Sequence, residues 1–344
     1  MKKTTFAFAA AAFLVAGAAA NAQTPPARTS TLDAVKGRGV LTCGVNTALP
    51  GFSNPNSQGV WQGLDVDLCK AIAAAVFGDA NKTKFVPTTS QQRFVALQSG
   101  EVDVLTRNAT QTLLRDTTLG LHMAGVNFYD GQGFIVKRSM NVTSAKQLDG
   151  ATVCVQPGTT TELNLADYFR SNKLKFTPVV IERLEENIAS YQAGRCDAYT
   201  TDASGLASVR SNLAVPNDHV ILPERISKEP LGPMVRKGDD QWFAIVKWVL
   251  TAMIEAEEYE VTQANVDAQL KSTNPGIQRM LGVTPGFGKA LGLDEKWAYN
   301  VIKQVGNYAD SYERNVGPKT PIGLERGVND LWTKGGLMYA LPLR

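Results

Sequence analysis

The stretch CVQPGTTTELNLADYF, residues 154–169, joins a β-prone run to a helix-like run through Pro157-Gly158. Thr159 and Glu162 are three residues apart, which is the capping-box pattern that begins many helices. A glycine-led helix start also exposes backbone N–H groups, and with threonine hydroxyls beside them these suit a carboxylate or phosphate. The stretch therefore predicts a strand, a turn and a helix. A helix cap and an anion site are both open interpretations of that turn.

The same strand-then-helix order recurs along the chain. Val40–Val45 and Val102–Leu105 are short apolar runs typical of buried strands. Between them, GLDVDLCKAIAAAVFG at 63–78 has apolar residues at helical spacing and a closing glycine. Alternating strands and helices predict an α/β fold with parallel or mixed sheets that helices cover on both faces.

Two similar steps enter buried strands in the two halves of this region, SGEVDVL at 99–105 and AGRCDAY at 193–199. They indicate one architectural unit used twice. After Gly232 the character changes: Trp242–Ala256 predicts a strong amphipathic helix, and residues 265–344 predict several helices with Gly-rich loops. This last segment contains no recognisable catalytic or binding motif. We expect it to cover and stabilise the first of the two halves.

The N-terminus has the layout of a secretory signal peptide. Lys2 and Lys3 precede the apolar run Phe6–Ala20, and small residues surround an expected cleavage site after Ala22. A membrane anchor is the alternative, but the apolar run is short and Ala-rich for a span. We therefore expect residues 1–22 to be removed and the mature protein to be exported.

Export places the cysteines in an oxidising compartment, where an even set can pair. Four cysteines allow three connectivities. We expect Cys43–Cys69 and Cys154–Cys196, because each pair closes a local loop within one half of the chain. A zinc site would need tighter ligand spacing, and the chain has only two histidines, so we expect no metal.

Composition and motifs also exclude several classes of function. The net charge is only +3, and the chain has no basic stripe interleaved with aromatic residues, so we expect no nucleic-acid partner. It has no GxxxxGK phosphate loop and no GxSxG nucleophile elbow. His122 and His219 stand apart from any serine or cysteine motif. We therefore expect neither an enzyme nor a cofactor.

Polar residues follow the predicted strands at the ends where α/β sheets bind ligands. Arg115 can grip a carboxylate with two parallel N–H donors, although a single arginine at a helix start is usually exposed and without a ligand. Asp202 can meet an ammonium group or can merely cap the following helix. With N–H donors at Thr159 and Thr160, these charges together match a free α-amino acid.

Several segments together resemble the periplasmic solute-binding proteins of polar amino acid ABC importers, the extracellular solute-binding protein family 3. The resemblance is closest to the general L-amino acid-binding subgroup and runs from about Thr31 to the C-terminus. Its motifs are GLDVDLCKAIA, ALQSGEVDVLTRNATQTLLRDTTLGL, DGQGFIVKRS, VCVQPGTTTELNLADYF, GRCDAYTTDASGL and ISKEPLGPMVRKGDDQW.

The resemblance implies a two-lobed periplasmic-binding-protein fold of type II, with two hinge strands and a ligand cleft between the lobes. Lobe 1 would comprise residues 31–132 and 232–344, including a helical extension from about residue 265, and lobe 2 would comprise residues 133–231.

The resemblance also implies a role for each site residue. Arg115 would hold the ligand α-carboxylate, and Asp202 would take the α-amino group. Thr110, Thr159 and Thr160 would assist Arg115, and the Asn108 carbonyl would assist Asp202. The PGTTTEL turn would then both cap its helix and supply donors to the ligand.

Side-chain selectivity is expected to depend on a second group of residues. Ser90 and Arg93 match positions that contact the distal carboxylate in glutamate/aspartate-binding relatives, although Arg93 could instead be a solvated helix residue. Those relatives carry an arginine at the position of Asn46, and binders of basic amino acids carry an acid there. Asn46 with Leu49 and Phe52 therefore suggests a permissive pocket, although Gln111 replaces a tryptophan common in the subgroup.

From this resemblance we expect a monomeric periplasmic protein with no cofactor. It would bind many L-amino acids, with some preference for Glu, Gln, Asp and Asn, and deliver them to inner-membrane ABC permease subunits. Two alternatives remain open at this point: a periplasmic enzyme on the same fold, such as a cyclohexadienyl-type dehydratase, and a sensor that presents its ligand to a receptor.

Overall fold

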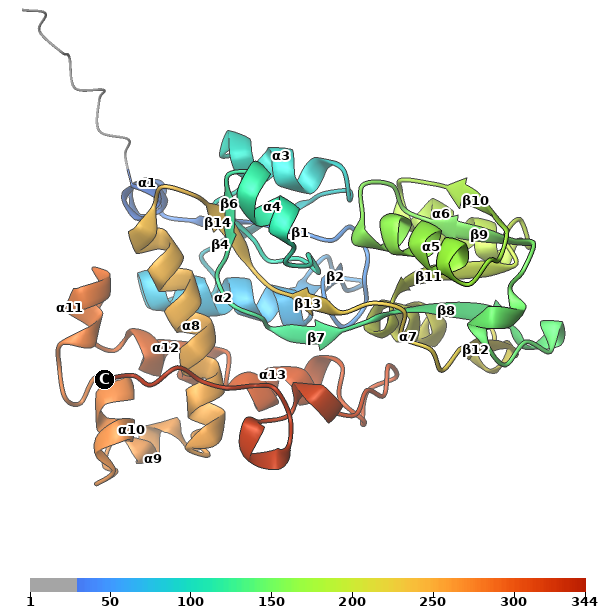
Figure 1. Ribbon diagram of the computed structural model, residues 1–344. Helices are drawn as coiled ribbons and strands as arrows, with labels where there is room; N and C mark the ends of the chain where they lie inside the picture. Colours follow the sequence, from blue (N-terminus) through green and yellow to red (C-terminus); the bar gives the residue numbers. More distant parts are fainter. Residues whose placement is uncertain (1–29) are drawn as a thin grey trace, which may run out of the picture.

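Two five-stranded sheets form two lobes side by side, joined by a two-stranded ladder between them (Figure 1). The computed structural model describes residues 30–344, so the expected signal peptide and its cleavage site lie outside the described residues. The predicted α/β class and the two-lobed arrangement are both confirmed.

Lobe 1 contains the sheet of strand order β4-β1-β5-β14-β6. The first three strands run parallel, and β14 is antiparallel to both of its neighbours. The strands are β1 (Leu41–Val45), β4 (Thr83–Pro87), β5 (Val104–Leu105), β6 (Leu121–Met123) and β14 (Met234–Arg236), with a small hairpin of β2 (Asn54–Pro55) and β3 (Trp61–Gln62). The helices are α1 (Thr31–Arg38), α2 (Leu64–Phe77), α3 (Gln92–Ser99), α4 (Leu113–Thr118) and α8 (Asp240–Glu258).

Lobe 2 contains the sheet of strand order β10-β9-β11-β8-β12. Its strands are β8 (Gln132–Lys137), β9 (Ala151–Val155), β10 (Phe176–Val180), β11 (Ala198–Asp202) and β12 (His219–Ile221). Its helices are α5 (Thr160–Ser171), α6 (Leu184–Gln192) and α7 (Ala203–Ser211). The stretch at residues 154–169 therefore folds as predicted, with the end of β9 followed by a turn and α5.

The ladder between the lobes pairs β7 (Phe128–Asp130) with β13 (Glu229–Leu231) in antiparallel fashion. These are the two hinge strands that the family resemblance implies. Both disulfides have the expected connectivity, Cys43–Cys69 and Cys154–Cys196. The first connects β1 to α2 within lobe 1, and the second connects β9 to the segment before β11 within lobe 2.

Packing explains why α2 and α8 form and stay in place. The alanine-rich α2 is almost wholly buried and ends at Gly78, whose φ of 70° favours glycine. Trp242 of α8 is fully buried, and its indole N–H donates to the carbonyl of Asp103 at 3.0 Å. Burial of one large aromatic side chain with its N–H satisfied is a strongly stabilising arrangement.

The C-terminal extension packs on lobe 1, on the side away from its sheet (Figure 1). It contains α9 (Val266–Gln269), α10 (Pro275–Met280), α11 (Phe287–Leu291), α12 (Trp297–Gln304) and α13 (Tyr308–Asn315), followed by irregular chain with short 3-10 turns. Trp297, Tyr308 and Tyr312 are buried in the same core cluster as residues of α2 and α8. The expectation that this segment covers lobe 1 is therefore confirmed.

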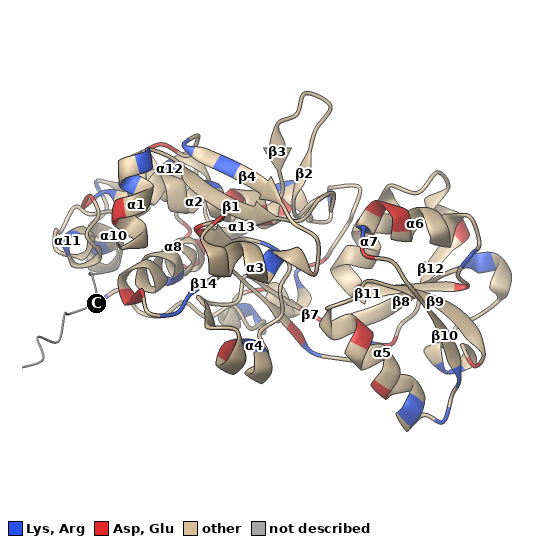
Figure 2. Cartoon of the chain, turned by 90° about the horizontal axis from the view of Figure 1, so that it is seen from above, with Lys and Arg blue, Asp and Glu red and all other residues tan. Residues whose placement is uncertain are grey.

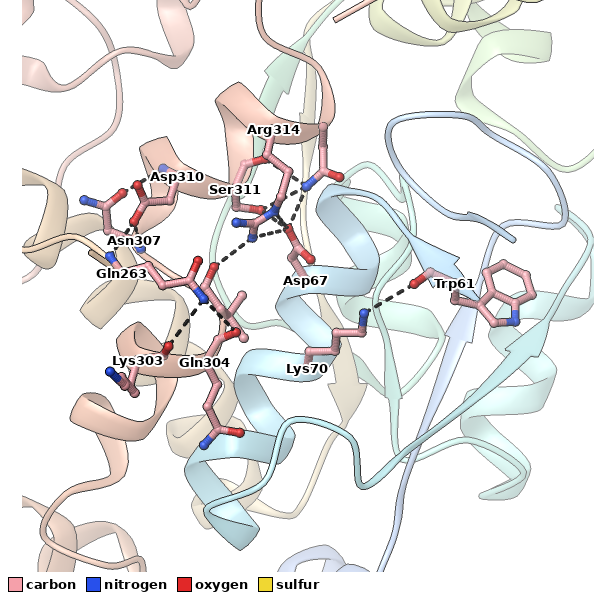
Figure 3. Close-up of polar contacts among 12 residues, drawn as sticks. Trp61, Asp67, Lys70, Gln263, Lys303, Gln304, Asn307, Asp310, Ser311 and Arg314 are labelled. Carbon is pink, nitrogen blue, oxygen red and sulfur yellow. Dashed lines mark hydrogen bonds and ion pairs between the residues drawn. The ribbon is translucent and has the colours of Figure 1, made fainter. Parts of the chain in front are cut away.

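A polar cluster fastens this extension to lobe 1. The Oδ2 atom of Asp67, on α2, accepts hydrogen bonds from Ser311 at 2.7 Å, Arg314 at 2.7 Å and Asn315 at 2.6 Å (Figure 3). All three donors belong to α13, and the Asp67 residue is only 7% exposed. One buried carboxylate therefore serves three side chains that are more than 240 residues away in sequence.

The surface and the helices of residues 30–344 show two further features. Lys and Arg lie among Asp and Glu on helices of both lobes (Figure 2). Within this range, no helix has both the length and the apolar character needed to span a bilayer.

We predict that Asp67→Ala lowers the free energy of unfolding by about 2 kcal/mol, because its three donors lose a common acceptor. The measurement is the urea midpoint of the purified protein. Asp267→Ala is the control, since Asp267 bonds Lys303 and Tyr299 at an exposed position in the same extension. Equal effects of the two substitutions would contradict the assigned importance of the Asp67 cluster.

Candidate ligand-binding site

The two lobes touch across the cleft through side chains from several elements. Thr89 Oγ1 donates to Glu182 at 2.6 Å, and Ser208 Oγ donates to the Pro50 carbonyl at 2.7 Å. Between these contacts the hydroxyl oxygens of Thr110 and Thr160 lie 3.3 Å apart. The lobes are therefore in a closed arrangement.

Arg115 and Arg93 enter the cleft from lobe 1, and both are buried. They are 9% and 3% exposed, and each guanidinium faces the ring of Phe94, at 4.9 and 4.7 Å from its centroid. Arg115 Nη1 donates to the Thr110 carbonyl at 2.9 Å, and Arg93 Nη1 contacts the Asn108 carbonyl at 3.4 Å. The alternatives of an exposed Arg115 and a solvated Arg93 are thus wrong.

Burial is the main influence on the ionisation of these arginines. It lowers the pKa of Arg115, and it lowers the pKa of Arg93 well below its usual range, with the neighbouring positive charges of Arg107 and Arg115 adding to the effect. The Nε atom of Arg93 has no hydrogen-bond partner among the described residues. A buried cation with an unsatisfied donor is suited to an anionic group.

Arg107 is a third buried arginine at this junction, and the sequence analysis did not single it out. Burial lowers its pKa to about 10, opposed by the charges of Asp65 and Asp202. Asp65, at the start of α2, is the lobe-1 acid whose charge acts on Arg107. Burial raises the pKa of Asp65 to about 7, while a hydrogen bond from Asn127 and the charge of Arg107 lower it.

Asp202 enters the cleft from the end of β11 in lobe 2. Its Oδ2 atom accepts from Asn108 Nδ2 at 3.4 Å, and Asn46 Nδ2 in turn donates to Asn108 Oδ1 at 3.0 Å. Among the described residues, the Asp202 side chain makes no capping hydrogen bond to α7, so the alternative that it merely caps this helix is wrong. Burial raises the pKa of Asp202 well above its ordinary value, and the negative charges of Asp130 and Glu229 raise it further.

Glu229 on the hinge strand β13 is a second site residue that the sequence analysis missed. It is 1% exposed and accepts from the hydroxyls of Thr110 and Thr160, one from each lobe. Asn164 and Ser227 donate to its other oxygen at 2.8 and 2.6 Å. The carboxylate also interacts electrostatically with Arg115 and Arg93. Its position in the motif KEPLG gave no local signal of this role.

The turn before α5 proves to be a helix cap of slightly altered form. Thr159 Oγ1 accepts from the Glu162 N–H at 3.1 Å and donates to the Gln156 carbonyl at 2.8 Å. Glu162 accepts from the N–H of Gly158 at 3.0 Å, one residue earlier than in a capping box. The Thr159 hydroxyl is therefore committed to the turn, whereas the Thr160 hydroxyl points toward the cleft residue Glu229.

Two of the predicted selectivity residues are as fully buried as the charged groups. Ser90 is buried beside α3, at 1% exposure. Phe52 is also 1% exposed, and its ring meets that of Phe128 on hinge strand β7 edge-on at 5.5 Å. The structure thus places Phe52 in the core beneath the hinge, and its contact with a ligand stays a prediction.

The junction as a whole is rich in buried charge of both signs. The three guanidinium groups interact electrostatically with three carboxyl groups, those of Asp65, Asp202 and Glu229, and burial raises the pKa of the first two. Burial also lowers the pKa of the three arginines, so it disfavours charge of either sign. Such a site is suited to a ligand that carries a carboxylate together with an ammonium group near Asp202. Within residues 30–344, no group of three His, Cys, Asp or Glu side chains is placed to hold a metal ion.

Comparison with known proteins agrees with this geometry. The profile of the bacterial extracellular solute-binding proteins, family 3, matches residues 41–265. The chain belongs to this family. It is 56% identical over 336 residues to the general L-amino acid-binding periplasmic protein of Rhizobium johnstonii, with 97% of each chain covered. It is 55% identical over 346 residues to a glutamate/glutamine/aspartate/asparagine-binding protein of Rhodobacter capsulatus, with 100% of each covered.

Solved structures of this family have the same fold. A periplasmic binding protein from Brucella ovis with glutathione bound is 55% identical, with a TM-score of 0.91 over 92% of this chain and 100% of that one. An ancestral amino acid-binding protein, described as a precursor of cyclohexadienyl dehydratase, is 29% identical with a TM-score of 0.57 over 67% of this chain and 96% of that one.

We predict that Asp65→Asn flattens the dependence of stability on pH. The folded pKa of about 7 exceeds the ordinary value of 3.8, so the folded state holds a proton that the unfolded state has lost between these values. Protonation of Asp65 therefore stabilises the wild-type protein fully below about pH 4. This stabilisation is lost as the pH rises to 7, by up to roughly 1.4 kcal/mol per pH unit. Urea midpoints at pH 5 and pH 7.5 measure it. An unchanged slope in the variant would contradict the protonated state of Asp65.

Proposed function

We propose that the protein is the periplasmic substrate-binding component of an amino acid ABC transporter, which captures L-amino acids and delivers them to membrane permease subunits. The observation that carries this proposal is that buried Arg93 and Arg115 of lobe 1 lie within electrostatic range of Asp202 of lobe 2 across a closed cleft. The high identity to amino acid-binding periplasmic proteins supports it.

In this proposal Arg115 binds the ligand α-carboxylate. The hydroxyls of Thr110 and Thr160 donate to Glu229 in the structure, so Arg115 and the free N–H groups of the first turn of α5 make the main contacts. Asp202 receives the α-ammonium group, and the nearby carbonyl of Asn108 accepts from it. A bound ammonium would restore the charged form of Asp202, because an opposite charge lowers the pKa of a buried carboxyl.

Closure of the lobes is driven by contacts that exist only when they meet. Arg115 belongs to lobe 1, whereas Asp202 and Thr160 belong to lobe 2, so a single amino acid bridges them. A ligand shifts the open and closed populations only by its difference in affinity for the two states, and this bridging supplies the difference. Exclusion of water then strengthens each charged contact.

The side-chain pocket would favour Glu, Gln, Asp and Asn within a broad range. Arg93 is the cationic group available to a distal carboxylate or amide oxygen, with Ser90 and Asn46 as neutral neighbours. Asn46 is held by Asn108 rather than by a charge. A neutral residue there neither demands an acid nor repels one, which supports breadth.

A second candidate ligand is the tripeptide glutathione, which a solved relative at 55% identity holds. Its γ-glutamyl unit has a free α-carboxylate and α-ammonium, the same head group as glutamate. The alternatives of a dehydratase and of a receptor-presenting sensor have no comparable support, since the relatives of high identity are binding proteins.

We further propose that the protein works in the periplasm as a monomer and without a cofactor. The bounds of its lobes would be close to those expected from the sequence, residues 31–132 with 232–344 for lobe 1 and residues 133–231 for lobe 2. Export would follow cleavage after Ala22.

The test is isothermal titration of the refolded mature protein with the twenty L-amino acids, glutathione and prephenate, a cyclic acid. We expect dissociation constants near the micromolar range for several amino acids, about −8 kcal/mol each. Arg115→Ala should weaken all of them more than a hundredfold, because the ligand carboxylate would be buried without its partner. The control is Arg170→Ala, at an exposed ion pair of lobe 2. Binding retained by Arg115→Ala would refute the assigned role, and turnover of prephenate would identify an enzyme.

Arg93→Gln is expected to change selectivity rather than abolish binding. Removing this cation should weaken glutamate and aspartate by about tenfold more than alanine or serine, since a charge-assisted hydrogen bond contributes roughly 1.5–3 kcal/mol. The measurement is the ratio of dissociation constants for glutamate and alanine. An unchanged ratio would show that Arg93 does not contact the ligand side chain.

A further inference from the structure

The C-terminal extension lies outside the part of the chain that the family profile matches, which ends at residue 265. The long relatives nevertheless match over 97–100% of the chain. Asp67 fastens α13 to lobe 1, and Arg326 bonds Glu257 of α8 at 3.1 Å while facing the rings of Tyr308 and Tyr312. The extension therefore moves as part of lobe 1.

From this position the extension reaches hinge strand β7, where the ring of Tyr312 stacks on that of Phe128 at 6.1 Å and Asn329 bonds the backbone. Asn329, at the end of a 3-10 turn (Gly327–Asn329), accepts from the N–H of Tyr129 at 2.6 Å and donates to the carbonyl of the same residue at 2.9 Å. Asn329 is 4% exposed. Its amide thus pairs with the free edge of hinge strand β7 as a neighbouring strand would. Two residues earlier in the chain, the Asn127 carbonyl accepts from Tyr308 Oη at 2.7 Å.

The next residue of the same strand belongs to the other lobe. Asp130 accepts from the N–H of Ser204, on α7, at 3.1 Å, and the N–H of Ala203 donates to the Gly131 carbonyl at 2.9 Å. The division between the lobes in β7 thus falls between Tyr129 and Asp130.

The second hinge strand divides at the same level. The Pro230 carbonyl accepts from the N–H of Gln111 in lobe 1 at 2.9 Å. Glu229 receives most of its bonds from lobe 2, from Thr160, Asn164 and Ser227. In the ladder, Tyr129 is paired with Pro230 and Asp130 with Glu229. The two divisions therefore lie directly opposite each other.

We propose that Asn329 is a positioning residue that holds hinge strand β7 on lobe 1, so that the lobes rotate at the Tyr129–Asp130 and Glu229–Pro230 steps. The extension then acts as a brace for the hinge. These steps lie two to three residues before the lobe boundaries expected from the sequence. The proposed function enters only through the affinity measurement below.

The physical effect of the brace is on the open state. Without Asn329, Tyr129 and its neighbours gain backbone freedom in the open protein, and closure has to order them again. More open conformations then compete with the closed one. Part of the binding free energy of a ligand that selects the closed state is then used to order the hinge, so the apparent affinity of that ligand falls.

The test is the distance distribution between spin labels on the two lobes, measured by double electron–electron resonance without added ligand. Val95→Cys on α3 and Val215→Cys in lobe 2 are suitable sites, at 63% and 52% exposure. We expect Asn329→Ala to broaden the distribution and to weaken glutamate binding by roughly three- to tenfold. The distance measurement requires no ligand, so it tests the brace even if the proposed function fails.

Asn307→Ala is the matched control. Asn307 is also a buried asparagine of the extension, but its amide donates to the Val261 carbonyl at 2.9 Å and accepts from the Asp310 N–H at 2.8 Å, and neither partner belongs to a hinge strand. It should lower the melting temperature and leave the distances unchanged. Asn329→Asp, which keeps only the acceptor for the Tyr129 N–H, should broaden the distribution less and serves if Asn329→Ala does not fold. An unchanged distribution in the Asn329 variants, or equal broadening by Asn307→Ala, would overturn the proposal.

Discussion

The burial of three guanidinium groups where the two lobes meet is the constraint on which the rest of the structure depends. A buried cation is tolerated only with nearby opposite charge or well-made hydrogen bonds. Here the acids come from elements far apart in sequence, Asp65 on α2, Asp202 on β11 and Glu229 on β13. The fold has to bring a helix, a lobe-2 strand and a hinge strand together to satisfy lobe 1's arginines. The charges of the buried arginines are thus compensated only if the two lobes are arranged correctly.

This constraint also links binding to movement. Asp202 belongs to lobe 2 and Glu229 to the hinge, so part of the charge compensation for Arg93 and Arg115 is supplied only when the lobes approach. Burial at the same time keeps the pKa of Asp202 high, which limits the negative charge that the protein itself provides. A zwitterion completes both halves of the arrangement, with its carboxylate for the arginines and its ammonium for the acid. The closed state gains most from such a ligand.

Sequence reasoning identified those residues of the candidate site that have local signals, and their contacts with a ligand stay predictions. Arg115, Asn108, Thr110 and Asp202 follow buried strands, and strand ends are where α/β sheets place ligand-binding groups. The disulfides were also predictable, since each closes a short loop. Arg107 and Glu229 were not, because their importance comes from burial and from partners such as Thr110, 119 residues before Glu229. The Thr159 hydroxyl illustrates the opposite case, a residue whose local capping role takes up its hydroxyl.

The C-terminal extension also has a feature that could not be predicted from the sequence. Its amphipathic helices can be predicted from the sequence, but the backbone hydrogen bonds that link it to hinge strand β7 join Asn329 to Tyr129 across 200 residues. A hydrogen bond from an asparagine to a backbone edge leaves no pattern in either segment. Its consequence is nonetheless mechanical, because a strand held on one edge by β13 and on the other by Asn329 resists bending along its length. Bending is then favoured where that support ends, at Asp130, the residue that begins the connection to lobe 2.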